Sequence, residues 1–379
     1  MAIVVNSLAP FQSKIGQECV DSPLIVRAIE SSSKPLEGGI FWVAPFMELR
    51  DDAQFRDAYP NADSYSDMLA HSDYRRQLVA IALWDPHSAK GVEILRHNFE
   101  KRQRLVHIHN FTAMKSFADA FRKDLDIETH KEDYIVVAPD GGSLHRSMLL
   151  ANELRLRVAL FDKTRPDVGD VEFGNLYIAG ADGKVVAADE SVIRGKKILI
   201  MDDLYATTKT AVVGAKRLKE VYGVAQIHFA ATHAAYVMPE AEQYLGEALR
   251  KKILDSAYVT DTLPSCGWVK GVKVVSFAYP MSLVMKVAGG VASISEVRAL
   301  EPYYFDPGPD KDIIKKRLKD GQLDLRPERW EWLHPPLMMK PWGLIYHYWR
   351  GKDIPELYEQ GMDYAYPERK MIREKAGNG

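Results

Sequence analysis

The sequence predicts an α/β fold built on parallel sheets. Short runs rich in β-branched and other apolar residues alternate with amphipathic helical stretches along the 379 residues. The runs are nearly continuous in apolar residues, which is typical of strands covered on both faces. Polar clusters follow several runs directly, where ligands sit in parallel sheets. At about 150 residues per domain, the length predicts two domains with an appendage.

The expected elements follow one another in a regular order. Strands are predicted at residues 40–45, 78–84, 134–139, 157–161, 197–201, 226–232 and 257–260. Helices are predicted at residues 63–72, 113–125, 144–154 and 210–221. The loops that follow the strands are therefore the places to look for chemistry.

Composition narrows the class of protein. Apolar residues make up 46% and charged residues 27%, which is ordinary for a globular chain and excludes global disorder. Fifty Lys and Arg face 52 Asp and Glu, so the basic excess of a dedicated nucleic-acid binder is missing and we expect no nucleic-acid partner. Cys19 and Cys266 are the only cysteines, which excludes a disulfide scaffold and fits a reducing compartment.

The chain carries no obvious membrane or export signal. Its first residues lack a charged segment followed by a long apolar core, so we expect no signal peptide. The longest apolar stretch, residues 274–291, is interrupted by Pro280 and Lys286 and is too short to span a bilayer. We expect a cytoplasmic protein with no membrane partner.

The character of the sequence changes from about residue 291. Four of the seven tryptophans lie in residues 330–349, among prolines. We expect an α-rich C-terminal extension that packs on the core or on a partner subunit, with ligand binding as the alternative.

The loop after the strand at 197–201 is the richest in functional groups. Asp202 and Asp203 can accept hydrogen bonds from a ribose diol or bind a divalent ion. The Thr207, Thr208, Lys209 and Thr210 stretch then opens a helix, where backbone N–H groups and hydroxyls favour a phosphate. The alternative is an acidic strand end with an N-capping threonine.

Three further loops carry candidate ligands. Asp85-x-His87 and Asp140-Gly-Gly supply an imidazole and carboxylates that can position Mg²⁺, and the glycines let the backbone approach a phosphate. A locally bonded histidine and a plain turn are the alternatives. Lys163-x-Arg165 can close on a polyphosphate, although a basic pair is more often simply solvated. The joint occurrence of these groups at successive strand ends favours a phosphate-transfer site.

Together these motifs resemble the phosphoribosyl-diphosphate synthetases (ribose-phosphate diphosphokinases), over roughly residues 40–281. The family's Pro-Asp-x-Gly-Gly segment is matched by VAPDGGSLHRSMLLANEL, and its Lys-x-Arg loop by LFDKTRP. Its ribose-phosphate loop is similar to KKILIMDDLYATTKT, its Val-Thr-Asp/Asn-Thr-Ile/Leu-Pro signature to AYVTDTLP, and its metal segment to LWDPHS. A weaker similarity links PFMELRDD to the family's ATP segment.

The resemblance implies two phosphoribosyltransferase-like (type I) parallel-sheet domains. The expected division is a shortened N-terminal domain at 1–142, a C-terminal domain with the ribose-phosphate loop at 143–290, and the aromatic-rich extension at 291–379. Such proteins usually assemble, so a homo-oligomer is expected.

The resemblance also implies an activity, which is transfer of the β,γ-diphosphate of ATP to the anomeric 1-hydroxyl of a 5-phosphorylated ribose. Mg²⁺ and ATP would be required. The implied catalytic residues are Lys163 and Arg165, and the implied metal ligands are His87, Asp140 and Asp202. ATP would contact Phe46, Arg50, Asp85 and His87, and the ribose phosphate would contact Asp202, Asp203, Thr207, Thr208, Lys209 and Thr210.

The chain departs from the family in three places. Only about 40 residues precede the first matching strand, fewer than the family usually has. The extension is foreign to the family. The phosphate loop has Ala206 and Lys209 where the family has an aspartate and a glycine. Because these changes affect the acceptor side, the acceptor is expected to be ADP-ribose, as in a viral branch resembling this family that rebuilds NAD, or ribose 5-phosphate, with a slight preference for ADP-ribose.

Two other classes stay open. A phosphoribosyltransferase would share the Asp-Asp/Thr loop, but it would not need His87 or the Lys163-x-Arg165 pair. A non-catalytic regulatory subunit of a synthetase complex would tend to lose the catalytic and metal residues, which this chain keeps.

Overall fold

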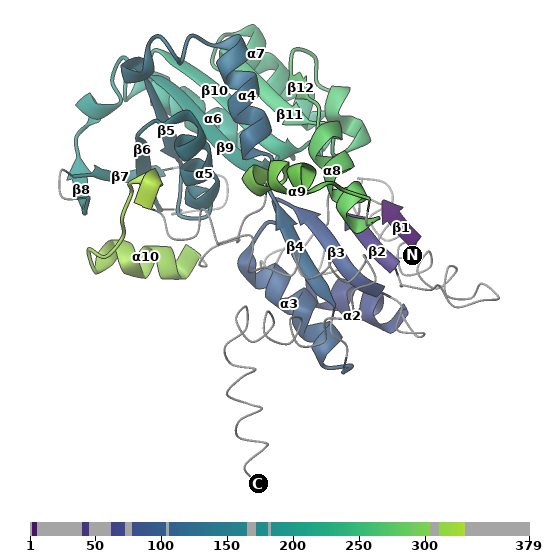
Figure 1. Ribbon diagram of the computed structural model, residues 1–379. Helices are drawn as coiled ribbons and strands as arrows, with labels where there is room; N and C mark the ends of the chain where they lie inside the picture. The colour runs from purple at the N-terminus through teal and green to yellow at the C-terminus, as the bar shows by residue number, and fades with distance from the viewer. Residues whose placement is uncertain are drawn as a thin grey trace.

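Two sheets organise the chain. The structure is a computed structural model, and it describes residues 2–5, 40–44, 62–72, 78–103, 106–164, 172–180, 183–289, 291–303 and 311–329. One sheet has four strands in the order β1-β2-β3-β4, and the other has eight in the order β12-β11-β10-β9-β5-β6-β7-β8. Figure 1 shows each sheet in its own lobe, with α8 and α9 at the junction.

The four-stranded sheet is entirely parallel. Its strands are β1 (Ala2–Val5), β2 (Ile40–Ala44), β3 (Leu78–Trp84) and β4 (His107–Phe111). Helices α2 (Ala62–Ser72) and α3 (Ala89–Glu100) cover one face. Helix α3 begins where the hydroxyl of Ser88 accepts a hydrogen bond from the Gly91 N–H at 3.0 Å, which caps an otherwise unpaired donor.

The eight-stranded sheet combines a parallel part with an antiparallel extension. The parallel strands are β5 (Tyr134–Ala138), β6 (Val158–Thr164), β9 (Lys197–Leu204), β10 (Gln226–His233), β11 (Ser256–Thr260) and β12 (Lys273–Val275). Strands β7 (Glu172–Ala179) and β8 (Val185–Ala188) run antiparallel beside β6.

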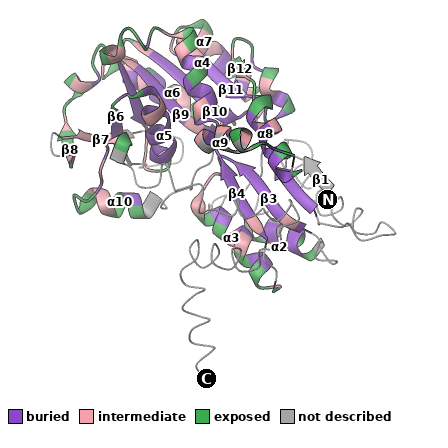
Figure 2. Cartoon of the chain, in the orientation of Figure 1, coloured by how far each residue is buried: buried purple, intermediate pink, exposed green. Residues whose placement is uncertain are grey.

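Helices cover both faces of this sheet, so its central strands are buried (Figure 2). One face packs against α4 (Met114–Asp124), α5 (Leu144–Leu154) and α8 (Ala278–Ala288). The other packs against α6 (Lys209–Glu220), the π-helical η4 (Glu242–Gly246) and α7 (Glu247–Arg250). The short helices are η2 (Lys131–Asp133), η3 (Glu190–Val192) and η5 (Pro264–Gly267). This two-sided cover explains the continuous apolar runs in the sequence.

Aromatic side chains join the two sheets into one core. The Trp84 ring, at the end of β3, stacks on Phe111 with centroids 4.9 Å apart and meets Phe277 edge-on at 5.2 Å. All three side chains are almost fully buried. Burial of each contributes about 1.5–3 kcal/mol, which fixes the end of β3 against the larger lobe.

The described part of the chain beyond residue 290 is helical. It contains α9 (Ile294–Ala299), η6 (Glu301–Tyr303), α10 (Lys311–Lys319) and η7 (Pro327–Arg329). The tryptophan-rich stretch at 330–349 lies outside the described residues. No helix in the described ranges is long and apolar enough to cross a membrane.

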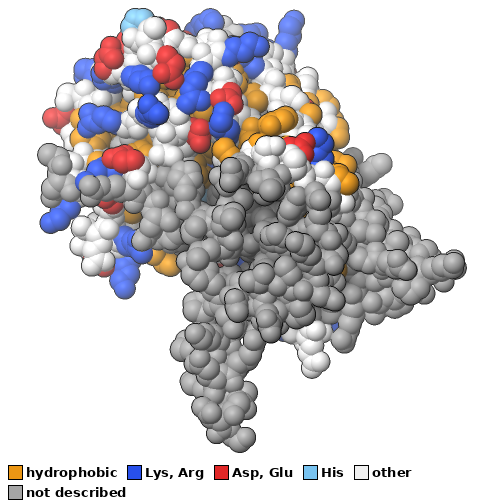
Figure 3. All heavy atoms as spheres, in the orientation of Figure 1, with side chains coloured by type: hydrophobic (Ala, Val, Ile, Leu, Met, Phe, Trp, Pro, Cys, Tyr) orange, Lys and Arg blue, Asp and Glu red, His pale blue; other side chains and the backbone are white. Residues whose placement is uncertain are grey.

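The predicted fold class is confirmed, with corrections to the element list. Strands β1, β4, β7, β8 and β12 and helices α3, α7 and α8 were not predicted. Strand β5 pairs with β6 and β9, so the sheets divide between β4 and β5, upstream of the expected boundary at residue 142. On the face visible in Figure 3, basic and acidic side chains are interspersed over the larger lobe, in keeping with a formal charge of −2.

Candidate active site

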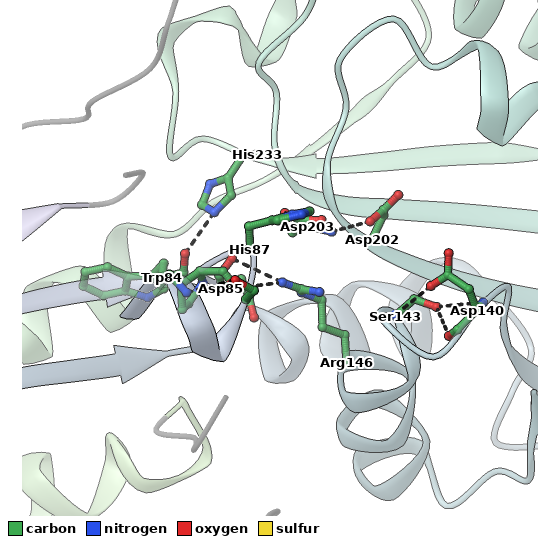
Figure 4. Close-up of polar contacts among 12 residues, drawn as sticks. Trp84, Asp85, His87, Asp140, Ser143, Arg146, Asp202, Asp203 and His233 are labelled. Carbon is green, nitrogen blue, oxygen red and sulfur yellow. Dashed lines mark hydrogen bonds and ion pairs between the residues drawn. The ribbon is translucent and has the colours of Figure 1, made fainter. Parts of the chain in front are cut away.

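Polar side chains from both sheets meet at the carboxyl ends of β3, β5, β9 and β10 (Figure 4). The smaller sheet contributes the loop Asp85-Pro86-His87 after β3, and the larger sheet contributes Asp140, Asp202, Asp203 and His233. Segments more than one hundred residues apart in sequence are thereby brought together, as expected at the ligand-binding edge of parallel sheets.

A contact between His87 and Asp203 links the two lobes. The His87 Nδ1 lies 2.8 Å from the Asp203 Oδ2, and the Asp203 side chain is only 9% exposed. Burial by itself would raise the pKa of Asp203, but the charges of His87 and Arg146 and the His87 hydrogen bond hold it well below its usual range. Asp203 is therefore a carboxylate at neutral pH.

Arg146, on α5, supports the His87 loop. Its Nη2 donates to the Pro86 carbonyl oxygen at 2.9 Å and to the Asp85 carbonyl oxygen at 3.5 Å (Figure 4). Arg146 is buried, and its positive charge helps to lower the pKa of Asp203 and partly opposes the rise that burial causes in the pKa of Asp202. The sequence analysis did not select Arg146, because its role in holding the loop depends on three-dimensional contacts.

The Asp85 carboxylate is committed to the interior of the protein. Its Oδ2 accepts from the Ala113 N–H at 2.9 Å and from the Thr232 hydroxyl at 2.7 Å, and the residue is 1% exposed. Its backbone, with φ of 37°, makes the sharp turn at the end of β3, a conformation that aspartate tolerates better than most residues. The expected contact with ATP therefore does not fit this carboxylate, which instead fastens the smaller sheet to β10.

His233, which the sequence analysis did not select, supports the same junction. Its Nε2 lies 3.0 Å from the Trp84 carbonyl oxygen, and its Nδ1 lies 2.9 Å from the Thr262 hydroxyl. Burial lowers the pKa of His233 to about 4, so the ring is neutral at physiological pH. Its position at the end of the predicted strand 226–232 was the available signal in the sequence.

Asp140 shapes the start of α5. Its Oδ1 accepts from the N–H groups of Gly142 and Ser143 at 3.0 and 3.1 Å, and the Ser143 hydroxyl donates to the Asp140 carbonyl oxygen at 2.9 Å. A Cβ at residue 142 would lie 3.3 Å from that Oδ1, so glycine keeps the turn tight. Asp140 thus forms the turn that the sequence analysis gave as the alternative to a metal site, and its negative charge adds to burial and Asp203 in raising the pKa of Asp202.

Asp202 and Asp203 form a pair of neighbouring carboxyl groups whose negative charges are not fully balanced by nearby cations. Burial, and then the charge of Asp203, raises the pKa of Asp202 to about 8. Its Oδ1 accepts from the Asp203 N–H at 2.9 Å (Figure 4). A proton or a divalent cation would relieve this repulsion.

The donor set fits Mg²⁺ bound partly by protein and partly by substrate. Within the described ranges, no three His, Cys, Asp or Glu side chains are grouped as a ready metal cage. Mg²⁺ commonly uses one or two carboxylates together with waters and substrate phosphates, and the charge excess at Asp202 and Asp203 provides for that arrangement. The predicted ligand set of His87, Asp140 and Asp202 is thus not assembled as one cluster, and His87 contacts Asp203 instead.

The loop after β9 presents an open helix N-terminus. Thr208 precedes α6 in the left-handed conformation (φ 62°), and its hydroxyl donates to the Thr207 carbonyl oxygen at 2.6 Å rather than capping the helix. The first N–H groups of α6 therefore receive no cap from Thr208, which counts against the N-cap alternative. Thr207, Lys209 and Thr210 are exposed beside them, as an anion site requires.

The remaining predicted residues are only partly described. Lys163 lies in β6, where it pairs with Phe173 of β7, and not in a loop after the strand as expected. Its side chain and Arg165, like Phe46 and Arg50, lie outside the described residues.

The VTDTLP segment proves to have a structural position. Asp261 accepts from the Phe277 N–H at 2.6 Å and the Ser276 hydroxyl at 3.1 Å, which anchors the start of α8. The Thr260 hydroxyl donates to the Thr232 carbonyl oxygen at 2.6 Å. This bond ties β11 to β10, whose Thr232 hydroxyl in turn donates to the Asp85 carboxylate.

Comparisons with known proteins agree with this architecture. The family described as "phosphoribosyl transferase domain" matches residues 108–279, so this part of the chain is similar to the phosphoribosyltransferase-type α/β proteins. Ribose-phosphate pyrophosphokinase 1 of Lactococcus lactis subsp. lactis is 28% identical over 196 residues, 52% of this chain and 53% of the relative. Ribose-phosphate pyrophosphokinase of Mycoplasma genitalium is 30% identical over 169 residues, 44% of this chain and 46% of the relative.

A solved structure extends the similarity to the fold. Phosphoribosylpyrophosphate synthetase from Mycobacterium smegmatis matches with a TM-score of 0.54 at 20% identity, covering 76% of this chain and 81% of that chain. The chain spans about half the length of the curated relatives it matches. The chain is thus similar to ribose-phosphate pyrophosphokinases, and the resemblance inferred from its sequence is confirmed.

Proposed function

We propose that the protein is a Mg²⁺-dependent diphosphokinase that transfers the β,γ-diphosphate of ATP to the anomeric 1-hydroxyl of a 5-phosphorylated ribose and releases AMP. The contact that best supports this function is the His87–Asp203 pair at 2.8 Å. It brings the loop after β3 onto the aspartate pair after β9, so donor-side and acceptor-side groups share one edge.

The acceptor side of the proposed site consists of the aspartate pair and the loop that follows it. The Asp203 carboxylate is ionised and oriented by His87, so it can accept hydrogen bonds from the ribose hydroxyls. The uncapped start of α6, with Thr207 and Thr210 exposed beside it, would receive the 5-phosphate. The 1-hydroxyl would then be fixed in position for in-line attack on the β-phosphorus.

The donor side depends on His87 and on the hairpin that carries Lys163. Mg²⁺, when bound, would neutralise phosphate charge and help to orient the diphosphate. The Asp202 and Asp203 carboxylates would hold it, with His87 reaching it directly or through water. Lys163, near the end of β6, and Arg165 would stabilise the charge on the transferring group.

Two acceptors fit this proposal. Ribose 5-phosphate is supported by the names of the relatives. ADP-ribose is the second candidate because Thr208 and the exposed Lys209 stand where smaller residues would wrap a terminal phosphate more closely. A long cationic side chain at that point suits a diphosphate as well as a monophosphate.

Mass spectrometry of the products tests both acceptors. The protein is incubated with Mg²⁺ and ATP, and with ribose 5-phosphate or ADP-ribose in parallel. Formation of AMP together with phosphoribosyl diphosphate, or with ADP-ribose carrying a 1-diphosphate, supports the proposal and identifies the acceptor. AMP release with neither product contradicts both acceptors, and no AMP at all favours a phosphoribosyltransferase or a regulatory subunit.

A loop variant separates the acceptors further. Thr208→Gly combined with Lys209→Gly restores small residues in the loop. The matched control is Lys216→Gly, which replaces an exposed lysine elsewhere on the same helix. If Lys209 contacts the second phosphate of ADP-ribose, the double variant loses activity with ADP-ribose more than with ribose 5-phosphate. An equal loss with both acceptors would count against a role of this loop in acceptor choice.

A further inference from the structure

A cavity lies at the edge of the eight-stranded sheet opposite to the candidate active site. Its volume is about 1020 Å³, and its walls are the end of α5, the start of β6, the end of β7 and η7. Helix α5 begins beside Asp140 and ends at this cavity. At 1.5 Å per residue, its 11 residues separate the two places by roughly 16 Å.

One wall is fastened to the β7–β8 turn. The backbone of Asp324 forms an isolated antiparallel β-bridge with Lys184. Its carboxylate forms a two-pronged ion pair with Arg326, whose Nε lies 2.9 Å from the Asp324 Oδ1. The guanidinium of Arg326 lies over Gly183, which has a φ of 85°, and a Cβ there would lie 1.8 Å from the guanidinium carbon. Glycine at 183 is therefore required for this placement of the Arg326 guanidinium, and these contacts hold the wall of the cavity in position.

Basic side chains dominate the cavity. Five cationic residues line it, against three glutamates: Arg122, Lys131, Arg155, Arg157 and Arg326, with Glu128, Glu153 and Glu328. Glu128 pairs with both Arg122 and Lys131, and Asp324 pairs with Arg326.

The five cations exceed the three lining glutamates by two charges, and Arg155 and Arg157 are the cations of this lining without an ion pair among the described residues. Both are exposed. Arg155 directly follows the carboxyl end of α5, where a positive charge is favoured by the helix dipole. Arg157, directly before β6, has no such helix end beside it. Two guanidinium groups, two positions apart on the wall of a cavity, are suited to the oxygens of a phosphorylated ligand.

We propose that this cavity binds a small molecule carrying an oligophosphate group. Its volume is at the upper end of the range of about 300–1,000 Å³ that is usual for ligand pockets, so a nucleotide-sized ligand fits. Arg155 and Arg157 would contact the phosphates, and Arg326 would close the far wall. The site is independent of the proposed diphosphokinase activity because it shares no residue with the candidate active site.

Inorganic triphosphate is a suitable probe because it carries the charge and no base. Binding is measured by calorimetry on the full chain in buffer with EDTA, which removes the Mg²⁺ that the proposed active site would need. We expect a saturable site, and we expect Arg155→Gln with Arg157→Gln to raise its Kd on the order of 10-fold or more. The matched control, Lys216→Gln with Lys251→Gln, removes the same charge from two exposed lysines and should leave the Kd within about twofold.

Hydrogen exchange on the unmodified protein gives an independent answer. Triphosphate should slow exchange in residues 151–158 and 325–328. An equal rise in Kd in both double variants would show non-specific attraction and overturn the proposal. So would binding without protection in those two segments, or no binding at millimolar triphosphate. An ATP and AMP titration of the same variants then tells whether a nucleotide base adds affinity.

Discussion

The two edges of the eight-stranded sheet differ in how their charges are balanced. At the amino-terminal edge, Lys197 pairs with Asp126 at 2.8 Å, Lys273 with Asp124 at 2.6 Å, and Lys219 with Asp255 at 2.8 Å. At the carboxyl-terminal edge, Asp202 has a raised pKa because burial and Asp203 both oppose its ionisation. Balanced pairs of this kind are typical of stabilising contacts, whereas a buried carboxylate with a raised pKa marks the carboxyl-terminal edge as a candidate ligand site.

Tyrosines complete the balanced edge. The Tyr134 hydroxyl donates to Asp126, and the Tyr258 hydroxyl donates to Asp124 at 3.2 Å. Burial, and then the hydrogen bond to Asp126, raises the pKa of Tyr134 to about 12, so this hydroxyl stays protonated and remains a donor. The aspartates of the amino-terminal edge are thus paired with lysines and tyrosines of the same chain, whereas Asp202 at the carboxyl-terminal edge is left with a raised pKa.

The sharpest test of this difference exchanges one aspartate at each edge. Asp203→Asn removes the charge that His87 orients, and we expect kcat/KM to fall on the order of 10²–10³-fold. Asp126→Asn is the matched control, because it removes a paired carboxylate from the opposite edge, and it should change kcat/KM by less than about twofold. A similar loss of activity in both variants would remove the distinction between the edges.

A second test uses one lysine from each edge. Lys163, near the end of β6, is proposed to stabilise the transferring diphosphate, whereas Lys273 begins β12 and pairs with Asp124 at the opposite edge. Lys163→Ala should lower kcat on the order of 10²–10³-fold. Lys273→Ala should leave kcat nearly unchanged, because it removes only a partly exposed ion pair. Activity of Lys163→Ala within about twofold of the unmodified protein would overturn the catalytic assignment.

Protons should distinguish the edges as well. Because the folded pKa of Asp202 is raised from 3.8 to about 8, the folded state holds this proton more tightly, and its contribution to stability is lost as pH rises through that window. We expect this loss to lower the unfolding temperature between about pH 4 and about pH 8 without Mg²⁺, and less so with Mg²⁺. Asp202→Asn should show a smaller fall, and an unchanged pH dependence would contradict this origin.

The smallest expected effect concerns His228, near the start of β10. Burial lowers the pKa of His228 from 6.5 to about 4. The His228 ring is therefore protonated near pH 6.5 in the unfolded chain, but only near pH 4 in the folded chain. Its contribution to stability is therefore present above pH 6.5 and lost as pH falls, by at most about 1.4 kcal/mol per pH unit. His228→Gln should flatten the acid side of the stability curve, measured by urea unfolding, without changing the slope at neutral pH.

Much of the fold was predictable because its strands are buried on both faces. Strands β2, β3, β5 and β9 are near-continuous apolar runs, and each was predicted. Strand β4, HIHNF, was missed because two histidines and an asparagine interrupt the run, although most of it is buried in the sheet. Strands β7 and β8 form an antiparallel hairpin, and a pattern tuned to parallel strands does not detect it.

The site was predictable in its residue types but not in its pairings. Asp202, Asp203, His87 and Asp140 all follow predicted strands, and the structure brings them to one edge. That His87 would face Asp203, and that Asp85 would turn inward to Thr232, depends on how two separate sheets dock. No local sequence pattern encodes this docking, because it depends on the long-range packing around Trp84 and Phe277.

The docking contacts also order events in time. His87 and Asp203 are separated by 116 positions, Asp85 and Thr232 by 147, and Trp84 and His233 by 149. Closing such long loops is slow and entropically unfavourable until both sheets exist. During synthesis, the smaller lobe therefore lacks these docking partners until β9 and β10 have emerged from the ribosome. Truncated translation products that end before these strands would lack the assembled edge, and with it the proposed active site.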